Sequence, residues 1–230
     1  MMTDDPLKCQ SMLNKKGVTL IELLVVLIIS GIVIGGVYRV FISQTKAYTV
    51  QDQVAEIQQD VRGAMEIMVR DIRMAGFQTN SFGSATITNG PIATPLNDTS
   101  ITVNYEYIPG AGAPATYTVT YAWPGPGGDL TRTLNGVQET LLSNVASLNF
   151  SYGIDADRDG IIDGIVNGVI PDNAFKSAAN VGTAIVFAIR VTLTANSASV
   201  DPDVTKMVSP RTLTSVVIPR NMFFKRYQAY

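Results

Sequence analysis

The stretch that decides the fold lies near the N-terminus, where residues 15–37 read KKGVTLIELLVVLIISGIVIGGV. From Val18 to Val37 this run covers about 20 residues, and a helix of that length, about 30 Å, matches the hydrocarbon thickness of a bilayer. Glu22 is the single charged residue within it. A carboxylate inside a membrane helix is costly and normally marks a function and a partner. We therefore expect a membrane-spanning helix in which Glu22 meets a positive charge.

The residues before this run predict its orientation and a source for that charge. Two lysines, residues 15–16, precede it, so the positive-inside rule places the N-terminus in the cytoplasm and sends the remainder of the chain across the membrane. A secretory signal peptide is the alternative, but the run is long for one and no A-x-A-like site follows it before Tyr38. A cut between Gly17 and Val18 would leave a new α-amino group one helical turn from Glu22. The amine of a neighbouring copy would serve equally well.

The composition excludes several classes of site. The chain of 230 residues has no histidine, and Cys9 is its only cysteine, which excludes histidine-based acid–base catalysis, a Cys/His zinc site and an intrachain disulfide. The formal net charge of −2 predicts no large basic face and therefore no nucleic acid as a partner. The apolar fraction of 46% is sufficient for a folded core beyond the membrane segment. We expect no enzymatic activity.

Beyond the membrane segment the helix is expected to continue. Apolar residues recur every three or four positions with polar residues between them, which indicates an amphipathic helix that ends near Gly76. The stripe consists of Val54, Ile57, Val61, Met65, Met68, Ile72 and Ala75. A helix from Val18 to Ala75 would have roughly 58 residues and a length of about 87 Å. We expect its second half to pack on a globular domain.

From Phe77 onward the sequence is typical of β-structure with loops. Residues 77–98 are rich in Ser, Thr, Asn, Gly and Pro, which indicates a long connection. Later runs rich in Val, Thr and Tyr predict strands at Ser100–Ile108, Ala115–Trp123, Asp129–Leu134, Val145–Tyr152, Thr183–Ala195 and Arg211–Ile218. The predicted fold class is α+β, in which one long N-terminal helix packs on an antiparallel β-sheet.

One loop in the β-rich part carries a metal-binding pattern. Residues 155–163 read DADRDGIID, with acidic residues at alternate positions, followed by a glycine at position 160 and a further acid. In a calcium loop this spacing points several hard oxygen ligands inward while the glycine permits a sharp turn. The candidate ligands are Asp155, Asp157, Asp159, the backbone carbonyl of Ile161, and Asp163. We expect a structural calcium ion that would fold this long loop in place of a disulfide.

The pattern departs from a complete calcium loop at its twelfth position. Val166 stands there instead of a bidentate glutamate, so a further ligand would come from Asp172 or from water. The alternative is a solvated acidic turn stabilised by Asx hydrogen bonds. A glycosidase-like carboxylate pair is disfavoured, because such enzymes hold two acids across a cleft and one contiguous loop does not readily provide that separation.

The segment KKGVTLIE, residues 15–22, together with the apolar run behind it resembles the prepilin signal of type IV pilins and of type II secretion pseudopilins. The resemblance implies cleavage after Gly17 by the prepilin peptidase of the inner membrane and N-methylation of Val18, although phenylalanine is usual at that position. It also implies that the helix is retained as the filament core and that Glu22 is needed for assembly, where it meets the N-terminal amine of an adjacent subunit.

This resemblance implies a division of the chain and a location for each part. The expected parts are a leader at residues 1–17, a transmembrane or filament-core helix at 18–42, its amphipathic continuation at 43–76, and a β-rich globular domain at 77–230 that contains the calcium-type loop at 155–166. The protein would be a single-pass inner-membrane protein with a periplasmic domain, and would move to a pilus or filament tip after assembly.

Three further segments narrow the resemblance. Residues 68–77, 141–152 and 211–221 are similar to PilW-type minor pilins and, more loosely, to J-type pseudopilins. The expected function is that of a minor pilin, which would help other minor and major pilins to initiate or cap a type IV pilus. The alternatives are a J-type pseudopilin of a type II secretion system and a membrane-anchored calcium-dependent adhesin. The charged residues at 70–73 would contact a neighbouring subunit or form a solvated helix end with local salt bridges.

Overall fold

The fold begins with one long helix, α1, Leu20–Met74, which contains 55 residues. The computed structural model describes residues 17–78, 91–107, 115–159, 161–165, 167–197, 208–219 and 221. The helix begins two residues later and ends one residue earlier than the sequence predicts. Gly76 follows its end with a φ of +77°, a left-handed conformation that favours glycine. A Cβ at Gly76 would also lie 3.2 Å from Pro91. The left-handed backbone ends the helix, and both constraints explain why the residue at this position is glycine.

The chain divides into two compact units, Met1–Tyr48 and Thr49–Tyr230. The described residues of the first unit belong almost entirely to the apolar part of α1, and all of them are exposed. An 18-residue window of this helix has a mean hydropathy of 2.7, and none of that window is buried. Among the described residues, α1 is the one helix that is long and apolar enough to cross a membrane.

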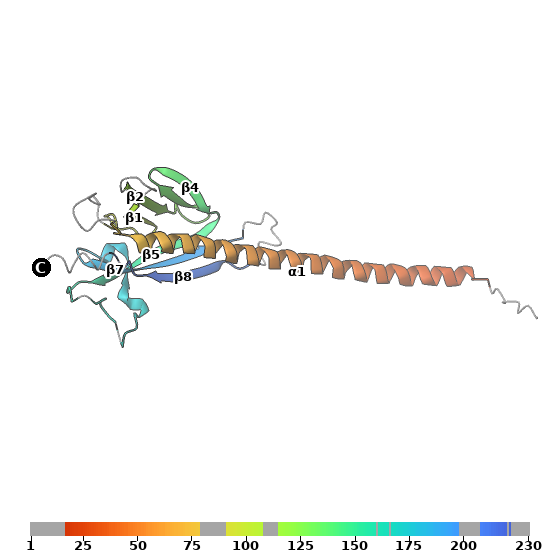
Figure 1. Cartoon of the computed structure of the whole chain (residues 1–230). Coiled ribbons are helices and arrows are strands. Elements are labelled where there is room, and N and C mark those ends of the chain that lie inside the picture. Colours follow the sequence, from red (N-terminus) through yellow and green to blue (C-terminus); the bar gives the residue numbers. More distant parts are fainter. Residues whose placement is uncertain are drawn as a thin grey trace, which may run out of the picture. The chain divides into compact units, whose positions relative to one another are not determined.

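In the second unit the strands form two four-stranded antiparallel sheets, and not the single sheet expected (Figure 1). The first sheet has the order β1-β2-β3-β4, with β1 at Ser100–Tyr107, β2 at Ala115–Ala122, β3 at Leu130–Leu134 and β4 at Val137–Leu142. The second has the order β6-β5-β7-β8, with β5 at Val145–Asp155, β6 at Phe175–Lys176, β7 at Ile185–Ala195 and β8 at Arg211–Val217. Short 3-10 helices precede and follow β6, namely η1 at Asp172–Ala174 and η2 at Ala178–Asn180.

Two of these strands, β4 and β6, are absent from the sequence prediction. Strand β4 is mostly exposed and lacks apolar alternation, and β6 has only two residues. The turn before β4 consists of Asn135 and Gly136, whose φ values of 48° and 88° are those of a two-residue hairpin. An Asn-Gly pair directly after a predicted strand was the signal for this hairpin. Of the predicted long connection and the predicted strands, residues 79–90 and Ile108 lie outside the described residues.

The amphipathic half of α1 supplies the centre of the core, as the sequence predicts. Its buried apolar residues are spaced by three or four positions and comprise Ile57, Val61, Ala64, Met65, Met68 and Ile72. They form one hydrophobic cluster with residues of both sheets, including Val103 of β1 and Val191 of β7. In Figure 1 the strands of both sheets gather around this part of the helix. An α+β arrangement with a long N-terminal helix packed against antiparallel sheets is therefore confirmed.

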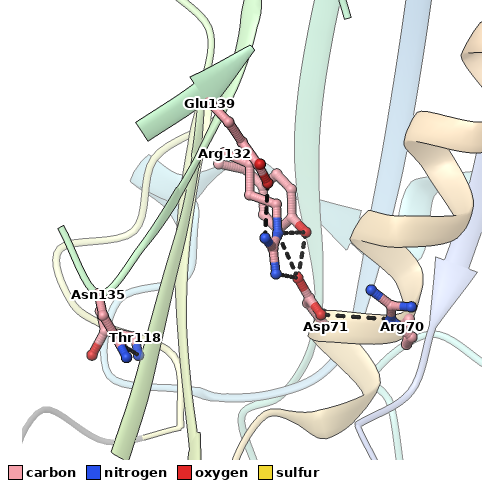
Figure 2. A network of polar contacts seen from close by, with 7 residues as sticks. Arg70, Asp71, Thr118, Arg132, Asn135 and Glu139 are labelled. Carbon is pink, nitrogen blue, oxygen red and sulfur yellow. Dashed lines mark hydrogen bonds and ion pairs between the residues drawn. The ribbon is translucent and has the colours of Figure 1, made fainter. Parts of the chain in front are cut away.

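A buried polar network joins α1 to the first sheet (Figure 2). Asp71 of α1 is only 3% exposed. Its Oδ2 accepts hydrogen bonds from the Tyr121 hydroxyl at 2.6 Å and from Arg132 Nε at 3.0 Å. Arg132 also pairs with Glu139 at 2.9 Å, while the exposed Arg70 lies 3.8 Å from Asp71. Asp71 fits neither a subunit contact nor a solvated helix end, because its own chain buries it, although it does form the salt bridges that the second interpretation expects.

The protonation states of Tyr121 and Arg132 allow both side chains to donate hydrogen bonds to Asp71. Burial and the bond to Asp71 raise the pKa of Tyr121, so the phenol remains protonated and donates. Burial by itself lowers the pKa of Arg132, but its bonds to Glu139, Tyr121 and Asp71 outweigh that effect and raise it. A carboxylate thus meets one neutral donor and one guanidinium, as a buried charge requires.

Replacement of Asp71 by Ala is expected to lower the free energy of unfolding by about 3 kcal/mol, because Arg132 and Tyr121 lose their shared acceptor while they remain buried. The measurement is urea unfolding of a fragment of residues 49–230, the whole second unit. The matched control is Arg70→Ala, whose side chain is 71% exposed and should change stability by less than about 1 kcal/mol. Equal effects of the two substitutions would contradict the central role of Asp71.

Candidate functional site

The first candidate site is the start of α1, where Thr19 caps the helix. The backbone N–H of Glu22 donates to Thr19 Oγ1 at 3.3 Å, and the N–H of Leu23 donates to the carbonyl of Thr19 at 3.2 Å. Thr19 therefore satisfies donors that have no partner within the first helical turn. This role of Thr19 was not predicted from the sequence, although Thr-x-x-Glu directly before an apolar run is the signature of a helix N-terminus.

The bond between Gly17 and Val18 lies just outside the helix. Both residues precede Leu20 without regular secondary structure, and Val18 is 70% exposed. A Cβ built at Gly17 meets no atom within 4 Å. The described part of the chain therefore leaves this peptide bond open to another protein, as proteolytic processing requires. Hydrolysis here would place a new amine directly before the helix cap.

Glu22 lies in the first turn of α1 and is exposed among apolar side chains. The helix dipole favours a negative charge at this end. Among the described residues no cation pairs with its carboxylate, and the next basic residue along the helix is Arg39. Its charge therefore has support from the helix terminus but no counter-ion in the described part of its own chain.

The second candidate site is the acidic loop after β5. Carboxylate oxygens of Asp155, Asp157 and Asp159 all lie within 4.8 Å of one another. Asp155, the last residue of β5, is fully buried, whereas the other two are exposed. Asp157 Oδ1 accepts from the N–H of Asp159 at 3.3 Å, and Asp159 Oδ1 accepts from the N–H of Ile161 at 2.7 Å. The fold thus brings together three of the predicted ligands on one short turn.

The remaining predicted ligands are placed differently. Asp163 is not in the group of three, and its Oδ2 accepts from the N–H of Ala156 at 3.1 Å, which ties the two ends of the turn together. Ile161 has an exposed side chain. The glycine at position 160 and Val166 lie outside the described residues. A metal ion at the group of three would need further oxygen ligands, because calcium takes six to eight.

The distal part of this loop is held by contacts that involve no acid of the group. Ile162 is buried in a small apolar cluster with Phe187 and Ala188 of β7. Asp172 forms an ion pair with Arg190 at 3.1 Å, and the Arg190 guanidinium lies 3.9 Å from the centre of the Phe175 ring. Asp172 is therefore engaged with β7 and is not a member of the acidic group.

The comparisons with known proteins concern the first of these sites. The family model described as "Prokaryotic N-terminal methylation motif" matches residues 12–38, a segment that contains Gly17, Val18 and Glu22. No curated protein matches the chain. The matched segment coincides with the open peptide bond, the capped helix start and the exposed apolar helix. It supports a type IV prepilin-like protein, that is, a pilin or pseudopilin that serves as a structural subunit and not as an enzyme.

Proposed function

We propose that this protein is a minor pilin, which helps to initiate or cap a type IV pilus after its leader is removed. The observation that carries the proposal is the combination at the start of α1. An open Gly17–Val18 bond precedes an exposed apolar helix that carries Glu22 in its first turn. The methylation motif over residues 12–38 supports processing by a prepilin peptidase and assembly with other pilins.

The proposed sequence of events follows from the charges. The lysines at residues 15–16 hold the N-terminus in the cytoplasm, and the apolar part of α1 anchors the chain in the inner membrane with its β-domain in the periplasm. Cleavage removes these lysines and creates an α-amino group at Val18. The amine of one subunit then pairs with Glu22 of the next, so that two charges that are costly in an apolar environment neutralise each other.

Two alternatives remain distinct from this proposal. A J-type pseudopilin would share every feature of α1 but would be encoded beside secretion genes, so the neighbouring genes discriminate between the two. An adhesin that remains membrane-anchored would not enter filaments. Its absence from sheared filaments would discriminate it from both.

The mature protein is expected to begin at Val18. Intact-mass measurement in cells with active prepilin peptidase should show the loss of residues 1–17 and one added methyl group. Gly17→Ala should be processed far better than Gly17→Leu, because a small residue is needed before the cut. Leader still attached to the unmodified chain in such cells would contradict the prepilin assignment.

Glu22→Ala should leave membrane insertion intact, because it removes a charge from the apolar segment. Its incorporation into filaments should fall by about tenfold or more, since the amine of the neighbouring subunit loses its partner. Quantitative immunoblots of membrane and sheared-filament fractions measure both quantities. The control is Glu22→Asp, which retains the charge and should retain part of the incorporation. Normal incorporation of the alanine variant would remove the pairing role.

We further propose that the acidic loop binds calcium. Three carboxylates within 4.8 Å of one another repel, and a bound cation would remove that repulsion. Hard oxygen ligands suit calcium, which accepts irregular geometry, better than magnesium, which demands an octahedron. The carbonyl of Ile161 and water would complete the ligands, with Asp163 bound directly or through water.

Calcium should therefore raise the stability of the fragment of residues 49–230, by about 2.7 kcal/mol at a hundredfold excess over the dissociation constant. Magnesium should have little effect. Asp157→Ala or Asp159→Ala should abolish the response, whereas Asp172→Asn should preserve it, because Asp172 pairs with Arg190. Thermal unfolding with calcium or with a chelator provides the measurement. Equal melting temperatures, together with no heat of binding in calorimetry, would leave the loop as an acidic turn.

A further inference from the structure

Gly63 occupies a position that the fold of its own chain does not explain. It lies in the second half of α1, about three turns before the helix ends, and is exposed. A glycine in a helix interior is destabilising relative to alanine. A Cβ at Gly63 would nevertheless meet no atom within 4 Å in the described chain. The absence of a side chain here serves no internal packing, but it does allow another backbone to approach α1 closely.

Gly63 lines a groove between α1, the end of β4 and the end of β7. The groove has a volume of about 470 Å³. Its apolar lining consists of Ile57, Ala64, Ile67, Leu141, Leu142 and Ala195. Glu56 and Asp60 stand on its helix side, and both are exposed. Within the described part of the chain, neither carboxylate takes part in an ion pair or hydrogen bond. The groove is therefore an apolar recess with an acidic rim.

The acidic rim selects the charge of the occupant. Residues 198–207, which follow the groove residue Asn196 in the sequence, contain two aspartates and one lysine, so their net charge has the same sign as the rim. Charge complementarity instead favours a basic segment. Between Asp52 and Arg73 the exposed charges of α1 are separated along the helix, with acids up to Asp60 and mainly arginines from Arg62 onward. The acids are Asp52, Glu56 and Asp60, and the later charges are Arg62, Glu66, Arg70 and Arg73.

We propose that this groove receives the arginine-bearing segment of α1, residues 62–73, from a second copy of the chain. Identical membrane-anchored chains share one orientation, so their helices run parallel, and this step rests on the anchoring proposed above. A parallel neighbour displaced along the axis brings its arginines beside Glu56 and Asp60. The 14 residues between Glu56 and Arg70 set that displacement at about 21 Å. Such a head-to-tail contact leaves a free groove on one copy and free arginines on the other.

A groove of this size can serve as a contact site because both copies are confined to the same membrane. Two anchored copies have a high effective concentration, so a small contact can select a register that it could not hold in solution. The apolar lining and Gly63 provide close approach, and the charges provide the axial position. The contact thus specifies which part of a neighbouring helix lies beside each subunit.

Disulfide trapping of the full chain in its native membranes tests this contact. Two differently tagged versions are expressed together, each with Cys9→Ser. The first carries Asp52→Cys, one helical turn before Glu56, and the second carries Glu66→Cys, which the displacement of 14 residues places beside it. Oxidation should give the mixed disulfide in clear excess over a control pair. In that pair, Val137→Cys, on a hairpin residue that is 73% exposed, replaces Glu66→Cys.

Charge reversal provides the decisive comparison. Glu56→Lys with Asp60→Lys in the first version should lower the disulfide yield by about fivefold or more, and Arg70→Glu with Arg73→Glu in the second should do the same. The two reversed versions together should recover the yield. Gly63→Leu in the first version should also lower the disulfide yield. Gly63→Ala should raise thermal stability and lower the yield less than Gly63→Leu does. Unimpaired unfolding temperatures of all variants show that the fold is retained.

Any one of three results would overturn the inference. The disulfide yield could be no higher than that of the Val137 control, it could be unchanged by charge reversal, or the combined reversal could fail to restore it. Leader removal and filament incorporation are measured in the same cells. If both are normal while the disulfide is absent, only this contact is disproved. If the leader remains attached, the proposed function fails whatever the disulfide yield.

Discussion

Both sheets of the β-domain depend on a single buried stripe of α1. The sheets share no hydrogen-bonded strand pair among the described residues, and the apolar face of each must be buried against another element. Met68 and Ile72, both fully buried, lie in the cluster that includes residues of both sheets. The helix therefore acts as the common surface on which the two sheets are built. Asp71, on the same stretch of helix, adds a directional bond to the first sheet through Tyr121 and Arg132.

Asp71 and Glu22 present the same physical problem with opposite solutions. Each is a carboxylate on α1 whose charge needs compensation where water is excluded. Asp71 finds it within the chain, where a phenol and a guanidinium bind the same oxygen at 2.6 and 3.0 Å. Glu22 has the helix terminus and its cap but no paired cation in the described chain. This difference is the reason why we propose that Glu22 pairs with a neighbouring subunit.

The sequence predicts the parts of this fold that local patterns encode. The apolar run, the amphipathic stripe and most strands follow from periodicity over a few residues, and the structure confirms them. The separation into two sheets does not follow, because it depends on pairings such as β5 with β7 that no local pattern specifies. The partners of Asp71 are likewise 50 and 61 residues away in the sequence. Strand β4 and the cap at Thr19 did have local signals, in Asn-Gly and Thr-x-x-Glu, although neither feature was predicted.

The acidic loop shows where spacing predicts a site only in part. The alternating acids bring three carboxylates together because they fall on one tight turn, but Asp163 closes that turn through the N–H of Ala156 and stands outside the group. The distal part of the loop is attached to β7 by Ile162 and by the Asp172–Arg190 pair. These contacts hold the loop on the second sheet without any ion. A cation at Asp155, Asp157 and Asp159 would therefore not fold the whole loop, as the sequence first suggests, but would fix the turn at the end of β5 by removing the repulsion between its carboxylates.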